Sequence, residues 1–396
     1  MDFYTLYYTM RRFLLSFFFI ISLFSVRAAE LDSVRLSLLT CAPGSEIYAL
    51  FGHSAIRYEN PVKQQDWVFN YGMFSFKEPN FVMRFVKGET DYQLGVIPFR
   101  YFEAEYAVRG SSVYQQVLNL TNEEKMKLVR LLEENYLPSN RRYRYNYFYD
   151  NCTTRARDKV EESIQGKVVY PENEGTHTYR SILHEFMKGS AWSEFGIDLC
   201  LGSGADKPIE ERQQMFAPFY MLQAARGAMI HRTDTVVPFI REETKIVDAT
   251  LEDEPAFPLS PMTCAVILCL LTAALVGWGI HRGQMLWGWS VLLYAFQGIA
   301  GSIIAFLFFF SLHPTVDSNW LLMAFQPLPL LYLPMMIYKC VKKQKDPFHW
   351  LNAVCLTSFI ILMPFLPQEF NATVLPLALS LLMVSVGHLY VDYWKR

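Results

Sequence analysis

The chain has 396 residues, of which 52% are hydrophobic and 19% charged, and its formal net charge is −2. Nearly all the charge lies between residues 30 and 260, where acidic and basic residues are interspersed without a basic run, so we expect no nucleic-acid partner. A chain of this length and composition is expected to contain one soluble core and a more apolar part.

The first 28 residues are typical of a secretory signal. Arg11 and Arg12 precede an apolar run over residues 13–26, and small residues follow near Ala28, where we expect cleavage. An uncleaved first helix is the alternative, although the run is shorter than the roughly 20 residues that a membrane span needs. On either interpretation the domain that follows, residues 29–260, lies outside the cytoplasm.

The first half of this domain is predicted to be a mixture of strands and helices. A polar turn at residues 60–65 indicates a hairpin between two of the strands. Alternation or helical spacing of apolar residues predicts strands at 34–40, 54–59, 67–71, 92–97 and 113–120, and helices at 80–87 and 99–109.

The rest of the domain is predicted to place Cys152 at the start of a helix. Thr121 and Glu124 form a capping box for a helix that should end near residue 136. An aromatic, strand-like run at 143–149 leads to Cys152, which should lie at the N-terminus of a helix over 153–164. Further helices are expected near 179–187 and 210–228, and a strand near 235–240.

The last part of the chain is predicted to be a membrane domain, residues 261–396. Lysine and arginine follow the first, third and fifth apolar stretches, whereas the loops at 311–319 and 367–373 contain neither. Cationic loops stay in the cytoplasm, so this pattern predicts a multi-pass protein of the inner membrane with a cytoplasmic C-terminus. The predicted spans lie near 262–280, 284–312, 320–338, 350–366 and 374–390.

The predicted spans contain few ionisable residues. Gln297, Gln326 and Asn352 are their main polar members, and His388 and Asp392 lie towards the cytoplasmic end. An ion-coupled transporter normally needs buried charge, so the pattern favours an anchor or a platform that handles lipids.

Cys152 and His53 are the candidate catalytic pair. A cysteine at a helix N-terminus is favoured as the thiolate by the helix dipole and by unpaired N–H groups. A base is also needed, and the exported domain contains four histidines: His53, His177, His184 and His231. His53 follows Gly52 and begins a predicted strand, where its ring can be held rigidly.

Structural explanations compete with the catalytic one. Cys152 is alternatively a buried thiol or one half of a disulfide with Cys41 or Cys200, and His53 is alternatively a hydrogen-bonded core residue. Cys41 is a weaker nucleophile candidate because a loop, not a helix, should follow it. His177 and His184 share one helix face but lack a third ligand, so we expect no metal and no other cofactor.

Several short motifs resemble the Lnb-type lipoprotein N-acyltransferases. They are Leu-Thr-Cys-Ala-Pro-Gly at 39–44, Phe-Gly-His-Ser-Ala-Ile-Arg at 51–57, Phe-Asn-Tyr-Gly at 69–72 and Asp-Asn-Cys-Thr-Thr-Arg at 150–155. The similarity extends through the five-span region. The order of histidine then cysteine more distantly resembles permuted papain-like enzymes, including the NlpC/P60 and lecithin:retinol acyltransferase groups, which implies an α+β fold for the exported domain.

The resemblance implies a reaction and roles for particular residues. An acyl chain would move from a membrane phospholipid through a Cys152 thioester to the α-amine of the lipid-modified N-terminal cysteine of a diacylated lipoprotein. In papain-like folds a third polar residue orients the imidazole; Asn70 is favoured here over Asp66. Arg57 and Arg155 are candidates for binding a lipid phosphate, and ordinary structural ion pairs are the alternative for both.

Two other functions remain open from the sequence. A membrane-anchored cell-wall peptidase or amidase would use the same Cys/His pair, although five spans exceed the anchorage that it needs. A non-enzymatic membrane scaffold, in which Cys152 is structural, is the other alternative.

Overall fold

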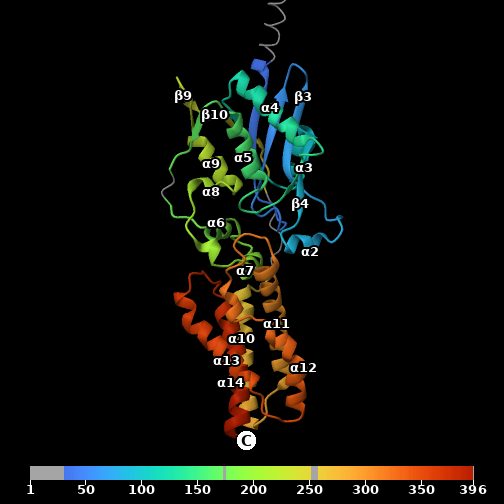
Figure 1. Ribbon diagram of the computed structural model, residues 1–396, viewed down its shortest axis with the longest axis vertical. Coiled ribbons are helices and arrows are strands. Elements are labelled where there is room, and N and C mark those ends of the chain that lie inside the picture. The colour runs from blue at the N-terminus through green and yellow to red at the C-terminus, as the bar shows by residue number, and fades with distance from the viewer. Residues whose placement is uncertain (1–30, 173–174, 251–256, 396) are drawn as a thin grey trace, which may run out of the picture.

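The computed structural model describes residues 31–172, 175–250 and 257–395, so the expected signal at 1–28 lies outside the described residues (Figure 1). A sheet-rich domain comes first. Five helices follow that are long and apolar enough to cross a membrane. This arrangement confirms the predicted α+β domain with a C-terminal helical bundle.

The domain is built on a seven-stranded antiparallel sheet with the order β10-β5-β1-β2-β3-β4-β6. In its centre, β1 pairs with β2 so that Cys41 lies opposite His53. A small second sheet has the order β7-β8-β9. The strands are β1 Arg35–Cys41, β2 His53–Asn60, β3 Gln65–Met73, β4 Asp91–Pro98, β5 Val113–Leu118, β6 Arg142–Arg144, β7 Lys167–Val169, β8 Met229–His231, β9 Val236–Pro238 and β10 Ile240–Val247.

Helices cover both faces of the large sheet. Because successive side chains of a strand point to opposite faces, each strand contributes to the cores on both sides. Leu36 and Leu38 of β1 belong to the core formed with α4 (Asn122–Tyr136), α5 (Cys152–Ser163) and α9 (Pro218–Gly227). Leu39 and Cys41 belong to the core formed with α3 (Phe99–Val108). The remaining helices of the domain are α2 Phe81–Val86, α6 Tyr179–Phe186, α7 Ala191–Cys200, η1 Ser203–Asp206 and α8 Glu211–Gln214.

Some predicted elements differ from those observed. The aromatic run at 143–149 forms strand only as β6, because the Asn146 side chain accepts hydrogen bonds from the N–H groups of Phe148 and Tyr149 and so makes a turn. The helix predicted near 210–228 is two helices, α8 and α9, and Pro218 begins the second. Helix α7 and most of β10 were not predicted.

The bundle consists of α10 Pro261–Arg282, α11 Trp287–Phe310, η2 Trp320–Met323 with α12 Leu328–Val341, α13 Phe348–Leu362 with η3 Met363–Phe365, and α14 Val374–Tyr390 with η4 Val391–Lys395. The third span is therefore interrupted at residues 324–327. Gly301 of α11 lies against the backbone of Gln326 at this break, and Gly298 lies against Leu330. Small residues at these positions allow close approach of the two segments.

The bundle meets the sheet domain through the two loops that contain no lysine or arginine. Residues 311–319 donate hydrogen bonds to the backbone of 86–87 and 199, and Gln368 donates to the carbonyl of Leu201 at 3.1 Å. Both loops therefore lie on the side of the sheet domain, in agreement with the charge pattern of the sequence.

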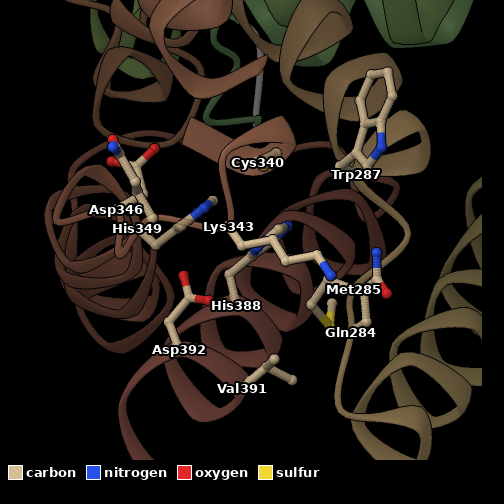
Figure 2. Close-up of a pocket in the computed structure, with 11 residues that line it drawn as sticks. Gln284, Met285, Trp287, Cys340, Lys343, Asp346, His349, His388, Val391 and Asp392 are labelled. Carbon is tan, nitrogen blue, oxygen red and sulfur yellow. The ribbon is translucent and has the colours of Figure 1, made fainter. Parts of the chain in front are cut away.

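A small polar pocket lies at the opposite end of the bundle. Its volume is about 30 Å³, enough for about one water molecule (Figure 2). The buried rings of His349 and His388 stack 4.1 Å apart beside it, with Asp346 and Asp392 nearby. His349 adds an ionisable residue to those noted in the spans, but the whole bundle separates this pocket from Cys152.

Candidate active site

Cys152, His53 and Asn70 meet at one end of the central sheet, although they are far apart in sequence. His53 begins β2, Asn70 lies on β3 and Cys152 begins α5, which packs against both strands. The thiol and the imidazole interact electrostatically, and both residues are only partly buried. The site therefore brings the candidate nucleophile and the candidate base together at a partly exposed position.

The amide of Asn70 holds the imidazole ring. Its Oδ1 lies 2.5 Å from His53 Nε2, and the Asn70 side chain is buried. An amide oxygen only accepts hydrogen bonds, so Nε2 carries the proton and Nδ1 is left for the thiol. This tautomer is the one that a base for Cys152 requires.

The local sequence places Cys152 in the first turn of α5. Asn151 is the N-cap, and its Oδ1 accepts hydrogen bonds of 2.9 Å from the N–H groups of both Thr153 and Thr154. The Asn151 amide nitrogen donates to the carbonyls of Tyr147 and Phe216, which fixes the cap in the core. The helix N-terminus is thereby rigid, and its positive end lies at the thiol.

Gly72 lies beside both the thiol and the imidazole, in a backbone conformation that favours glycine. A Cβ at this position would lie 3.7 Å from Cys152 Cβ and 3.8 Å from His53 Cε1. Its φ of +86° is also a conformation that residues with a side chain rarely adopt. The register of β3 against β4 shifts between Asn70 and Met73, so Gly72 lies in a bulge beside the site.

The surroundings favour charge separation between the two candidate catalytic groups. Burial disfavours the Cys152 thiolate, but attraction to His53 and hydrogen bonds from His53, the Ser54 N–H and the Thr153 hydroxyl lower the pKa of Cys152 to about 7. Burial also disfavours protonated His53, but the thiolate and the bonds to Cys152 and Asn70 raise the pKa of His53. Both directions favour a thiolate–imidazolium pair near neutral pH.

Both candidate phosphate-binding arginines have partners within the protein. Arg57 forms a two-pronged pair with Asp66 at 2.8 and 2.7 Å, and Arg155 forms one with Asp150 at 2.6 and 2.7 Å. These pairs correspond to the structural alternative for the two arginines. Asp66 bonds to Arg57, whereas Asn70 bonds to His53. Of the two candidates for orienting the imidazole, Asn70 is therefore the one that contacts it.

The other cysteines and histidines considered above lie outside this cluster. All seven cysteines, each within the described residues, are free thiols, and Cys41 is fully buried. His184 lies near Glu194 and 2.9 Å from Asp198 beside a hollow of about 380 Å³. Asp198 also accepts hydrogen bonds from Arg180 and Asn371, so its carboxylate is already part of an ion-pair network.

The sequence did not indicate the roles of three residues around the thiol. Thr153 Oγ1 lies 3.8 Å from Cys152 Sγ and 3.1 Å from Ser54 Oγ, and Gly72 lies beside both candidate catalytic groups. All three occur within the short motifs that carry the family resemblance. Their motif membership was the available signal, but only the fold reveals what they contact.

Two family models match the chain. The model described as the Lnb N-terminal periplasmic domain matches residues 24–185, and the model described as the Lnb transmembrane domain matches residues 252–396. Together they cover most of the chain, including the three residues of the candidate site. No curated protein and no solved structure matches it.

Proposed function

The chain belongs to the Lnb family, as a multi-pass membrane protein with a periplasmic N-terminal domain, and from this premise we propose that it is a lipoprotein N-acyltransferase. The acyl donor is a membrane phospholipid, and the acceptor is the α-amine of the lipid-modified N-terminal cysteine of a diacylated lipoprotein. The membrane is the inner membrane, and the C-terminus is cytoplasmic. The soluble domain at 29–260 carries the chemistry, and residues 261–396 are the membrane domain.

The observation that carries the proposal is the Cys152–His53–Asn70 arrangement. In the first half-reaction the Cys152 thiolate attacks an ester carbonyl of the phospholipid. The bond to the glycerol oxygen breaks, His53 gives its proton to that oxygen, and a lysophospholipid leaves an acyl thioester on Cys152. Asn70 keeps the His53 ring in the orientation that this transfer needs.

The second half-reaction regenerates the enzyme. The α-amine of the acceptor attacks the thioester carbonyl, His53 takes the proton from the amine nitrogen, and the Cys152 thiolate leaves with an amide as product. The backbone N–H of Cys152 itself is in the first helical turn, where it has no intrahelical acceptor. It is suited to stabilise the oxyanion that forms in both steps.

A cell-wall peptidase would use the same three side chains on a soluble polymer. The transferase is favoured by the position of the site. His53 lies at the end of the sheet away from the 60–65 hairpin. At that same end the chain leaves β3 and forms α2, which contacts the membrane bundle. Two lipid substrates that stay in the bilayer require such a position.

The thioester intermediate gives a direct test. Full-length protein in vesicles of phosphatidylethanolamine and phosphatidylglycerol should gain one acyl mass on Cys152, removable by neutral hydroxylamine. Cys152→Ser should lose that thioester, while the matched variant Cys200→Ser should retain it. Retention of the hydroxylamine-sensitive mass in Cys152→Ser, or its absence from the wild type, would count against the proposal.

A further inference from the structure

An exposed apolar patch lies on and before α2. It consists of Phe76, Val82, Met83 and Phe85, and Val82 is 72% exposed. The other side of α2 is held by the domain, because Phe81 stacks on Phe74 and Arg84 pairs with Glu78 and Asp91. The exposed side is thus presented outward by a fixed helix. We call these four residues the α2 patch.

The α2 patch adjoins the end of a membrane span. Ser311 Oγ donates to the carbonyl of Val86 at 2.8 Å, Leu312 N–H donates to the carbonyl of Lys87 at 2.8 Å, and His313 Nε2 lies 2.6 Å from the carbonyl of Phe85. Residues 311–313 directly follow α11. Figure 1 accordingly shows α2 at the lower edge of the sheet domain, at the level where the membrane helices begin.

The end of α11 continues the same apolar surface. Phe309 and Phe310 of its last turn and Leu312 just after it are all exposed. Side chains of this kind at the end of a span face lipid. Because residues 311–313 hydrogen-bond to the backbone carbonyls of 85–87, the α2 patch continues this lipid-facing surface onto the soluble domain. This continuity favours lipid, and not a protein partner, as the occupant of the α2 patch.

A series of aromatic rings connects the α2 patch with the thiol. Phe85 stacks on Phe81 with ring centroids 6.2 Å apart, and Phe81 stacks on Phe74 at 5.7 Å. Phe74 stacks on Tyr92 at 4.9 Å, and Tyr92 stacks on Tyr145 at 4.2 Å.

The last members of this series reach the candidate active site. Tyr145 and Phe74 pack against the same core cluster as Cys152. Phe74 is also only two residues beyond Gly72, where an added Cβ would lie 3.7 Å from Cys152 and 3.8 Å from His53. The rings thus lead from the bilayer end of the domain to the core cluster against which Cys152 packs.

We propose that the α2 patch inserts into the leaflet of the membrane on the side of the soluble domain, and that the ring series guides a phospholipid acyl chain from there to Cys152. The second part rests on the proposed acyltransferase function, whereas the first part does not. Aromatic and aliphatic side chains on a short interfacial helix are the type that binds at the boundary of head groups and acyl chains.

Photo-crosslinking tests the insertion without any need for catalysis. p-Benzoylphenylalanine replaces Val82 in the full-length protein, which is reconstituted in vesicles of phosphatidylethanolamine and phosphatidylglycerol. Val62 is the matched control because it is 65% exposed and lies in the hairpin turn at the other end of β2 from His53. We expect a phospholipid adduct at position 82 and none at 62. Equal adducts at both positions, no lipid adduct at 82, or adducts to a second protein chain instead would overturn the insertion.

A charge variant tests the acyl route. Val82→Asp should lower acyl transfer from vesicle phospholipid by about tenfold or more, since a carboxylate resists burial among acyl chains. In Val82→Asp, soluble iodoacetamide should alkylate Cys152 at the wild-type rate. The control Val62→Asp should change neither the rate of acyl transfer nor the rate of this alkylation. Unchanged transfer in Val82→Asp would overturn the route. If the wild type transfers no acyl chain at all, the proposed function fails, and the crosslink still decides whether the α2 patch meets lipid.

Discussion

At the scale of single residues, Cys152 depends on three neighbours of different kinds. The His53 ring supplies a counter-charge, the Ser54 N–H supplies a backbone hydrogen bond, and the Thr153 hydroxyl supplies a third donor. Burial works against all three, because it penalises the thiolate. The balance leaves a thiol that ionises near neutral pH.

The pH dependence of Cys152 alkylation follows from that balance. Because the pKa of Cys152 is about 7, its alkylation rate should rise with pH through about 7 and be low below it, where the thiol is protonated. In His53→Ala the thiolate loses the attraction of the imidazolium, while the burial that disfavours the thiolate remains. The midpoint of the pH profile of Cys152 alkylation should therefore move to higher pH. Peptide mass spectrometry after timed iodoacetamide treatment measures both profiles.

Cys200 is an internal control in the same samples. Burial raises the pKa of Cys200 to about 11, so its alkylation should stay slow at neutral pH in both proteins. The proposed Cys152–His53 pair would be contradicted if the alkylation midpoint of wild-type Cys152 matched that of an ordinary thiol and did not change in His53→Ala.

Asn70 should act by positioning the imidazole. Asn70→Ala removes the acceptor of the His53 Nε2 proton, so we expect acyl transfer to fall by about 10²-fold, within the usual contribution of a positioned base. The rate of transfer and the alkylation midpoint of Cys152 are measured together. Asn70→Gln retains an acceptor and should recover part of the rate, whereas a purely structural role would predict no such recovery at equal stability.

At the scale of elements, the site exists because a strand bulge and a helix N-terminus face each other. The bulge of β3 contains Gly72, and the N-terminus of α5 contains Cys152. Neither element alone would bring the two candidate catalytic groups together. The capping of α5 by Asn151 and the positive φ of Gly72 are the local features that fix this meeting.

Gly72→Ala tests the bulge. The substitution places a Cβ in a left-handed conformation, at a cost of about 1–2 kcal/mol in unfolding free energy, and brings it against Cys152 and His53. We expect transfer to be lost to a greater degree than stability. Thermal unfolding and acyl transfer are compared with those of Gly196→Ala, which has open space around the new Cβ. Full activity in Gly72→Ala would show that the bulge is dispensable.

The sequence was informative where elements are regular. The capping box of α4 and the N-terminal position of Cys152 were predicted because each depends on residues a few positions apart. The meeting of His53 with Cys152 was not derivable in this way, since the two are 99 positions apart and only tertiary packing joins them. Strand β10 was missed because most of its residues are polar or partly exposed, and so show weak alternation.

At the scale of the whole molecule, the two domains are joined by a buried ion-pair network. Arg180 of α6 bonds Asp198 at 2.7 Å and Asp206 at 2.6 Å, and its side chain is only 1% exposed. Asp198 in turn accepts from Asn371, in the loop before α14, and Asp206 accepts from the N–H of Glu369 in the same loop. The network thereby connects the sheet domain with the bundle.

Arg180→Met should break this junction. It leaves two carboxylates without their main partner, one of them fully buried, so we expect a loss of about 3–5 kcal/mol in unfolding free energy. Arg35→Met is the control because the Arg35–Glu59 pair is exposed and should contribute no more than about 1 kcal/mol. Unfolding of both variants in detergent is measured by thermal melting. Equal melting temperatures for both would contradict a structural role for the network.

The most direct test of the central claim is the mass of a lipoprotein N-terminus from cells that carry or lack this gene. The lacking strain is complemented with the wild type or with Cys152→Ala, and it must contain no second N-acyltransferase. We predict that the amide-linked acyl chain disappears without the gene and returns only with the wild type. Lipoproteins that keep this chain in the deleted strain, or regain it with Cys152→Ala, would contradict N-acyl transfer through this thiol.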